Sequence, residues 1–366
     1  MHVPPTPTEL SAAAANVVDM VLRGGLADLR RTPASIIEEA PQGTVFRYLT
    51  PDAAGPPRDL PVLLVPPLAA PTICFDLRRG CSLAEHLLAI GHPTYLVEYG
   101  RIGFSDRQLG LEHWVEDVIP RAIRRVSEDA GGAPVQVVGW CLGGIMSLLA
   151  AAADLTLPIN SIALVASPFD FSRVRLIKPL RPLANATGGR LLSPVYRLLG
   201  GAPAPLVKRA FQLTSIDKEL TKPLAMLTHL DDRDFLAQLE AVDHFVDHMH
   251  AYPGRTFGQL YHRFFRVNEL AGGRLELDGR TIDLADVTAP VLSIAGDRDV
   301  LAPREAVHHV AALLPNAAAV RTETGPGGHL GVLTGRAAID TTWAWIDAFF
   351  ADHGSVAERP HLRVVA

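Results

Sequence analysis

The stretch Val135–Ala153, VQVVGWCLGGIMSLLAAAA, predicts a buried strand, a sharp turn and a helix in direct succession. Its first residues form an apolar run, and its last residues are leucines and alanines, which helices favour. Between them, Gly139, Gly143 and Gly144 surround Cys141 in the pattern G-x-C-x-G-G. This spacing is typical of a nucleophile elbow, whose turn is too tight for side chains at the flanking positions. We therefore expect the turn to hold the thiol clear of the sheet.

The helix that follows gives this cysteine its predicted chemistry. Unpaired N–H groups and the helix dipole at a helix N-terminus stabilise a thiolate. The N–H of Leu142 would also lie beside a developing oxyanion. The alternative interpretation is a buried structural cysteine near a helix start. The adjoining strand and helix favour the elbow, because they are the context that this motif requires.

Composition limits the class of protein. The chain has 366 residues, of which 48% are hydrophobic and 20% charged, as expected of a globular protein with a large core. This length suits two domains, or one α/β domain that carries an insertion. The net charge is −5, whereas nucleic-acid-binding proteins carry a basic surface. We therefore predict no nucleic-acid partner.

Cysteine usage and hydropathy indicate the compartment. The three cysteines, Cys74, Cys81 and Cys141, are too few and too unevenly spaced for a disulfide framework. The first residues lack the basic and apolar regions of a signal peptide. The apolar stretch 145–166 is interrupted by polar residues and a proline, so it does not predict a transmembrane segment. The sequence therefore predicts a cytoplasmic protein.

Apolar runs alternate with helical patterns on both sides of the elbow. Residues 61–65 and 161–166 are continuous apolar runs, typical of strands buried on both faces. Residues 93–97 and 290–296 repeat this pattern, and residues 111–130 form a long amphipathic helix between two strands. This alternation predicts an α/β fold with a mainly parallel sheet flanked by helices.

Apolar runs typical of strands no longer recur between residues 168 and 286. The sequence there becomes helix-like and rich in proline, glycine and aromatic residues. We interpret 168–286 as an inserted, mostly helical cap. The core then comprises residues 44–167 and 287–352. A helical N-terminal lead at 1–43 precedes it, and a C-terminal tail at 353–366 follows it.

Two further residues complete a triad with Cys141. Asp299 follows the strand at 290–296, and His329 lies in a glycine-rich loop. The chain order nucleophile, acid, histidine is the order of α/β-hydrolases, so we predict that fold, with His329 as general base and the aspartate as its orienting acid. Asp297 follows the same strand and is the alternative acid, although a helix N-cap is its other interpretation. A surface loop histidine is the alternative for His329.

The sequence also offers a second oxyanion donor and a candidate metal site. The loop after the strand at 61–65 is where α/β-hydrolases keep a second oxyanion donor, so the N–H of Leu68 or Ala69 is predicted for that role. His244 and His248 are four residues apart and could share a helix face as metal ligands. No companion motif supports this, and a solvated cap helix is the preferred account, so we predict no metal site.

A cysteine nucleophile changes the expected reaction. When a thiolate attacks a thioester, it forms another thioester, and the acyl group stays activated. The acyl group can then pass downhill to an alcohol, so transfer is favoured over hydrolysis where a cap excludes water.

Several short motifs recur along the chain in a recognisable order. They are Thr32-Pro33, VLLVPP at 62–67, FDL at 75–77, Gly91-His92, YLVEY at 95–99, GWCLGG at 139–144, SPFDF at 167–171, LYH at 260–262, NEL at 268–270, Asp299 with Pro303, and GHLG at 328–331. In this order they resemble the polyhydroxyalkanoate synthase family, from about residue 32 to about residue 350. The resemblance is closest to the family's shorter, class III-like catalytic subunit.

This resemblance implies an acyltransferase with Cys141 as acyl-carrying nucleophile, His329 as base and Asp299 as acid. It implies acyl-CoA or another acyl thioester as substrate rather than a bound cofactor, a growing polyester, a homodimer and a separate partner subunit. Two alternatives stay open: a thioesterase or esterase with a cysteine nucleophile, and a catalytically silent homologue that binds acyl ligands or granules.

Two positions depart from the family's pattern. Val300 stands where family members usually carry a histidine after the aspartate. The loop Leu68–Cys74 consists mainly of small apolar residues, where the family usually has an asparagine, a basic residue and tyrosines. Because this loop borders the expected acyl site, the sequence leaves the identity of the acyl group open.

Overall fold

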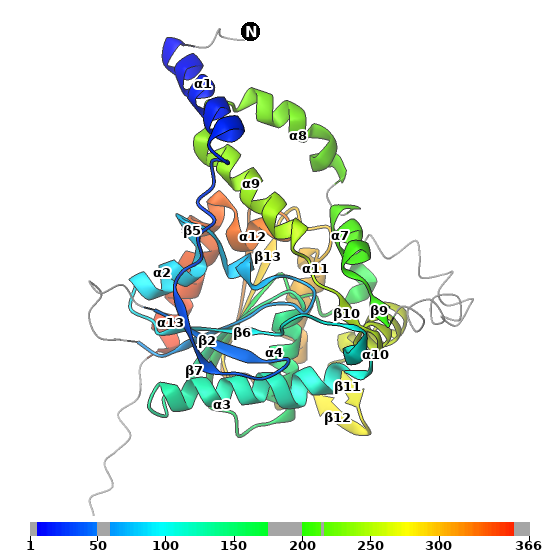
Figure 1. Cartoon of the computed structure of the whole chain (residues 1–366). Helices are drawn as coiled ribbons and strands as arrows, with labels where there is room; N and C mark the ends of the chain where they lie inside the picture. Colours follow the sequence, from blue (N-terminus) through cyan, green and yellow to red (C-terminus); the bar gives the residue numbers. More distant parts are fainter. Residues whose placement is uncertain (1–5, 50–58, 175–199, 214–215, 355–366) are drawn as a thin grey trace, which may run out of the picture.

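An eight-stranded sheet forms the centre of the computed structural model, which describes residues 6–49, 59–174, 200–213 and 216–354 (Figure 1). Its strands are β1 (Ala34–Glu38), β2 (Thr44–Tyr48), β3 (Val62–Val65), β6 (Thr94–Glu98), β7 (Val135–Trp140), β8 (Ile159–Val165), β13 (Val291–Gly296) and β14 (Val320–Gly325). They lie in the order β1-β2-β6-β3-β7-β8-β13-β14. The six strands from β6 to β14 are parallel, and β1 and β2 are antiparallel at one edge. The predicted mainly parallel sheet is confirmed.

Helices cover both faces of this sheet. They are α2 (Leu83–Ala89), α3 (Ile119–Asp129), α4 (Leu142–Ala153), α11 (Arg304–Val307), α12 (Gly331–Thr334) and α13 (Ala344–His353). On β7, Val137 packs into the core cluster of α3 and α4, whereas its neighbour Val138 packs into the cluster of α2 and α13. Successive side chains of a strand point to opposite faces, so both faces of β7 need apolar residues. This explains the apolar pair Val137 and Val138 before Cys141.

The described residues between β8 and β13 are mostly helical. Their α-helices and strands are β9 (Gly201–Ala202), α7 (Ala204–Leu213), α8 (Ile216–Thr228), α9 (Arg233–Asp247), β10 (Tyr252–Pro253), α10 (Gly254–Gln259), β11 (Arg274–Leu277) and β12 (Arg280–Asp283). Residues 175–199 of this region and 355–366 of the expected tail lie outside the described residues. The boundaries at 168 and 286 stay a prediction.

The N-terminal segment differs from the helical lead that we expected. Helix α1 (Pro7–Leu22) begins at Thr6, whose side chain accepts a hydrogen bond from the N–H of Glu9. Residues 34–38 form the edge strand β1 instead of a second helix. Pro33 and the β-branched pair Ile36 and Ile37 favour an extended chain there, and pairing with β2 adds hydrogen bonds that a separate helix would lack.

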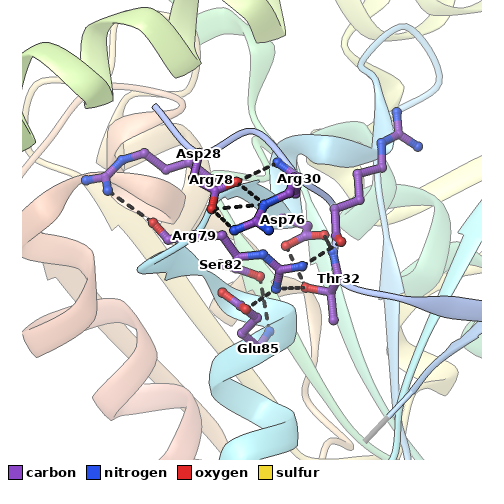
Figure 2. Close-up of polar contacts among 9 residues, drawn as sticks. Asp28, Arg30, Thr32, Asp76, Arg78, Arg79, Ser82 and Glu85 are labelled. Atoms are coloured by element: carbon purple, nitrogen blue, oxygen red, sulfur yellow. Dashed lines mark hydrogen bonds and ion pairs between the residues drawn. The ribbon is translucent and has the colours of Figure 1, made fainter. Parts of the chain in front are cut away.

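A polar network attaches this N-terminal segment to the core (Figure 2), and one of its members, Arg78, also binds the cap. The backbone N–H and the hydroxyl of Thr32 donate to the carboxylate of Asp76, in the short strand β4 (Asp76–Arg78), which pairs with β5 (Cys81–Ser82). In the same strand, Arg78 donates from Nε to Gln238 at 2.9 Å and from Nη2 to Asp234 at 2.6 Å. Since both partners lie on α9, Arg78 holds the cap helix in a defined place above the sheet.

Candidate active site

Cys141 occupies a strained turn between β7 and α4. Its φ of 53° and ψ of −121° lie in a region that residues with a Cβ rarely adopt. The turn is held by the backbone, because the N–H of Cys141 donates to the carbonyl of Val165 at 2.8 Å and its carbonyl accepts from Gly144 at 3.2 Å. Strain of this kind costs about 1–3 kcal/mol and persists where the surroundings enforce it. The thiol is partly exposed, unlike those of Cys74 and Cys81.

Close backbone contacts explain the three glycines of the motif. A Cβ on Gly139 would lie 2.4 Å from the Cα of Gly144. A Cβ on Gly144 would lie 2.2 Å from Oγ of Ser167, and one on Gly143 would lie 2.2 Å from the carbonyl oxygen of Val65. The start of α4 therefore packs directly against the ends of the neighbouring strands, which only glycine allows.

Gly143→Ala is expected to destabilise the protein, because the added methyl group meets the rigid backbone at Val65 and Pro66. The expected loss is about 1–3 kcal/mol in the free energy of unfolding, the usual cost of overpacking. Gly272→Ala is the matched control, since its Cβ would meet nothing within 4 Å. Thermal unfolding of both variants checks this, and equal melting temperatures would contradict the steric account.

His329 connects Cys141 with Asp299. Nδ1 of His329 lies 2.7 Å from Oδ2 of Asp299, while Oδ1 of Asp299 accepts from the N–H groups of Leu301 at 2.8 Å and Ala302 at 2.9 Å. An ionised carboxylate only accepts, so Nδ1 carries a proton. Nε2 is the ring nitrogen that remains for the thiol of Cys141, whose charge is among the causes that raise the pKa of this imidazole. His329 thus binds Asp299 and packs against Trp140, the neighbour of Cys141, so the three predicted side chains lie together.

The pair of His329 and Asp299 is charged in spite of its burial. Burial lowers the pKa of His329, but the charges of Asp299 and Cys141 and the hydrogen bonds to them outweigh it and raise this pKa well above 6.5. Burial likewise raises the pKa of Asp299, but the charge of His329, its hydrogen bond and two backbone N–H groups bring it below the ordinary value of 3.8. An imidazolium beside an ionised Asp299 is the expected resting state of this pair.

This pair predicts a defined pH dependence of stability. Because the pKa of His329 is raised, its contribution to stability is complete below pH 6.5 and is lost as pH rises through the raised pKa. In Asp299→Asn the carboxylate charge is gone, so burial should lower the pKa of His329. Stability should then be lost as pH falls below 6.5, the reverse of the wild-type effect. NMR titration of the imidazole measures the pKa of His329, and unfolding experiments across this pH range measure the stability. An unaltered His329 titration in the variant would contradict the assignment of Asp299 as the partner of His329.

The other candidate acid, Asp297, has a different position. Its Oδ1 accepts from the backbone N–H of Gly327 at 2.8 Å, and its own N–H donates to the carbonyl of Gly325 at 2.9 Å. Asp297 thus shapes the loop that carries His329, whereas Asp299 contacts the imidazole itself. The carboxylate of Asp297 therefore does not act as a helix N-cap, which is its other interpretation from the sequence.

The predicted oxyanion donors lie in two adjoining segments. Leu142 is the first residue of α4, and the first N–H groups of a helix have no partner within it. The turn after β3 closes with a hydrogen bond from the N–H of Ala70 to the carbonyl of Pro67, and it holds Leu68 and Ala69 2% exposed. The cap secures this turn, because the N–H of His250 donates to the carbonyl of Ala69 at 2.8 Å. The roles of Leu142, Leu68 and Ala69 as donors stay predictions.

Three aromatic residues around the site were not singled out from the sequence. Trp140 donates from Nε1 to the carbonyl of His329 at 3.2 Å, and its ring centroid lies 5.2 Å from that of the imidazole. Phe245 of α9 packs against Trp140 with centroids 5.9 Å apart. Tyr252 of β10 comes two residues after His250, whose N–H binds the carbonyl of Ala69, and burial raises the pKa of its phenol. Trp140 lies inside the elbow motif, so the sequence pointed to its position. No sequence pattern pointed to the two cap residues, because their approach to the elbow depends on tertiary structure.

The rings of His244 and His248 lie 4.2 Å apart at centroids, but the described residues contain no group of three or more His, Cys, Asp or Glu side chains able to hold a metal ion. Among the helices that the structure describes, none has both the length and the apolar character needed to cross a bilayer.

Comparison with known proteins relates the chain to one family of enzymes. No protein-family model matches it. Over 328 residues it is 26% identical to the poly(3-hydroxyalkanoate) polymerase subunit PhaC of Allochromatium vinosum, covering 89% of this chain and 90% of the relative. The subunits of Thiocystis violacea (27% identical, 89% and 90% covered) and Haloarcula marismortui (23% identical, 92% and 71% covered) are also similar. The resemblance inferred from the motifs is confirmed.

Solved structures with a similar fold are α/β-hydrolases. The putative non-heme bromoperoxidase BpoC of Mycobacterium tuberculosis has a TM-score of 0.50 at 18% identity, covering 82% of this chain and 95% of its own. Mouse alpha/beta hydrolase domain-containing protein 10 has a TM-score of 0.50 at 15% identity, covering 87% and 99%. At such identities the likeness concerns the fold alone, and it confirms the predicted α/β-hydrolase fold.

Proposed function

We propose that this relative of poly(3-hydroxyalkanoate) polymerase subunits is a cysteine-dependent acyltransferase. It takes acyl or hydroxyacyl groups from CoA thioesters onto Cys141 and passes them to a hydroxyl, with polyester synthesis as the first candidate. The observation that carries this proposal is His329, which is hydrogen-bonded to Asp299 and packed through Trp140 against the strained elbow of Cys141. The polymerase subunits similar to this chain, by their name, point to transfer.

The first half-reaction loads the enzyme. The thiolate of Cys141 attacks the thioester carbonyl, and the N–H groups of Leu142 and of Leu68 or Ala69 stabilise the oxyanion. The new bond joins Sγ to the acyl carbon, and the bond from that carbon to the CoA sulfur breaks. The imidazolium of His329 gives its proton to the departing CoA thiolate and becomes neutral, while Asp299 keeps the ring oriented.

The second half-reaction transfers the acyl group. Neutral His329 takes the proton of an acceptor hydroxyl, whose oxygen attacks the acyl carbon and displaces Sγ of Cys141 as thiolate. The imidazolium and thiolate of the resting state are thereby restored. Water would act as acceptor in the same way, so the outcome depends on its exclusion. Phe245 and Trp140, which are 0% and 1% exposed, place an apolar layer of the cap and the elbow beside His329 and support transfer.

One experiment identifies both the acyl group that the protein takes up and the acceptor to which it passes that group. Purified protein is incubated with 3-hydroxyacyl-CoA of several chain lengths, CoA release is followed, and the product is analysed after methanolysis. We expect CoA release, an acyl group on Cys141 and an ester product. Release with free acid as the sole product would replace the proposal by the thioesterase alternative. Neither release nor acylation of Cys141 would overturn it in favour of a silent homologue.

The assembly implied by the resemblance also stays a proposal. We expect a homodimer, and a separate partner subunit that raises the activity. Light scattering on the isolated chain measures whether it forms the homodimer, and a monomer at all concentrations would refute the homodimer.

A further inference from the structure

A basic cavity opens on the cap side of the molecule, between the helical turn Phe104–Gln108 and the helical segment that starts with α10. Its volume is about 530 Å³. The side chains around it include Arg107, Arg255, Arg263 and His262, together with glutamines and glycines. None of the nine described residues that line it is acidic. The lining therefore suits an anion more than a cation or an apolar group.

The arginines differ in how far their charge is already neutralised. Nη2 of Arg255 lies 2.8 Å from Glu112 and 2.9 Å from Asp278, and Nη1 of Arg263 lies 2.8 Å from Glu269. Arg107 instead stacks at 4.4 Å on the ring of Phe104 and donates to the carbonyl of that residue at 3.0 Å. It forms no ion pair with a carboxylate of the described residues. Its positive charge is thus the one most available to a ligand.

The carboxylate nearest to Arg107 in sequence is already occupied. Oδ2 of Asp106 accepts from the backbone N–H of Gly103 at 2.7 Å, and Oδ1 accepts from the side chain of Gln42 at 3.1 Å. These bonds keep Asp106 directed to its own turn. The fork of the Arg107 guanidinium matches the oxygens of a phosphate group, to which arginine binds in a bidentate way.

A two-stranded ribbon connects the cavity with the active site. β9 pairs with β10, with Ala202 opposite Tyr252, and the cavity residues Gly200 and Gly254 directly adjoin this pair. A Cβ on Gly254 would lie 3.0 Å from the carbonyl oxygen of Gly200, so the two walls touch. Gly254 is two residues from Tyr252, hence at most about 7 Å away along the chain. Two residues before Tyr252, the N–H of His250 donates to the carbonyl of Ala69 at 2.8 Å, in the turn after Pro66, against which Gly143 of the elbow packs. The ribbon therefore leads from the cavity to the turn beside the elbow.

We propose that this cavity binds the phosphate groups of CoA, with Arg107 as the main contact, while the pantetheine arm follows the β9–β10 ribbon to Cys141. This inference rests on the proposed function, since it takes a CoA thioester as the acyl donor. It adds the determinant by which the enzyme distinguishes a CoA thioester from a thioester without phosphates.

The test is equilibrium binding by calorimetry of two probes, CoA and pantetheine, the latter lacking every phosphate. The wild type should bind CoA more tightly, and salt should weaken CoA binding. Arg107→Gln should lower the ratio of the CoA to the pantetheine affinity about tenfold, as expected for loss of a charged hydrogen bond, and Arg107→Lys should restore part of it. Arg274→Gln is the control, because Arg274 is exposed on β11, pairs with Asp283 and does not line the cavity.

Two results would overturn this assignment: equal CoA affinities in Arg107→Gln and Arg274→Gln, or a wild type that binds CoA no more tightly than pantetheine. Melting temperatures of the variants check that they are folded, as expected for a half-buried residue in a surface turn. Acylation of Cys141 by acyl-CoA is measured on the same wild-type sample. Acylation without an effect of Arg107→Gln on CoA binding refutes the cavity alone, whereas Arg107-dependent CoA binding without acylation refutes the proposed function alone.

Discussion

Cys141→Ala is expected to lower the rate of acyl transfer by about 10⁴-fold or more, because neither half-reaction can proceed without the thiol. His329, the proposed general base, lies beside the elbow that carries this side chain. The other two cysteines are buried, and burial raises the pKa of Cys81 to about 11 and that of Cys74 well above 9.0. Both are therefore protonated at neutral pH.

Cys81→Ser is the matched control for this variant. Sγ of Cys81 donates to the carbonyl of Thr334 at 2.9 Å, and a serine hydroxyl can make the same hydrogen bond. We expect this variant to retain its activity and Cys141→Ala to lose it. Acyl transfer is followed by CoA release, and the acylated residue is identified by mass spectrometry of the trapped enzyme. Substantial turnover by Cys141→Ala, or an acyl group on another residue, would refute the assignment of the nucleophile.

Asp299→Asn is expected to reduce the rate by about 10³–10⁴-fold, the scale of losing the orienting carboxylate in a catalytic triad. The amide no longer balances the charge of His329, and its NH₂ group can face Nδ1 and impose the wrong tautomer. The fold should tolerate the change, since the amide oxygen can still accept from Leu301 and Ala302.

Asp297→Asn separates the acid of the triad from a neighbour on the same loop. Its contact is the backbone N–H of Gly327, which an amide oxygen accepts equally well, so we expect a change of less than about threefold. Both variants are compared by kcat/KM and by the pH profile of kcat. If Asp297→Asn were the more damaging of the two, the roles of the two aspartates would be exchanged.

Local patterns allowed the elbow to be predicted from the sequence. The glycine spacing around Cys141 reflects backbone contacts within a few residues and with adjacent strands, and such contacts leave a signature in residue type. The alternation of apolar runs and helices predicted the parallel sheet for the same reason, since a strand buried on both faces must be apolar on both. The edge strand β1 was not predicted, because the local preference of Pro33, Ile36 and Ile37 for an extended chain is weak and its pairing with β2 decides the conformation.

The candidate site depended more on tertiary structure. Chain order named both Asp297 and Asp299, and only the path of the loop after β13 shows which carboxylate meets His329 and which binds Gly327. The approach of Tyr252 and Phe245 to the elbow arises from the packing of the cap, which no local pattern encodes.

The sequence by itself therefore determined the α/β class and the elbow at Cys141, because these depend on strand burial and on turn geometry. The tertiary structure alone decided which aspartate contacts His329 and which cap residue packs against the elbow. It also decided that a basic cavity lies at the end of the β9–β10 ribbon. The physical reason is that these contacts join residues far apart in the chain, whose distance is set by the packing of whole elements.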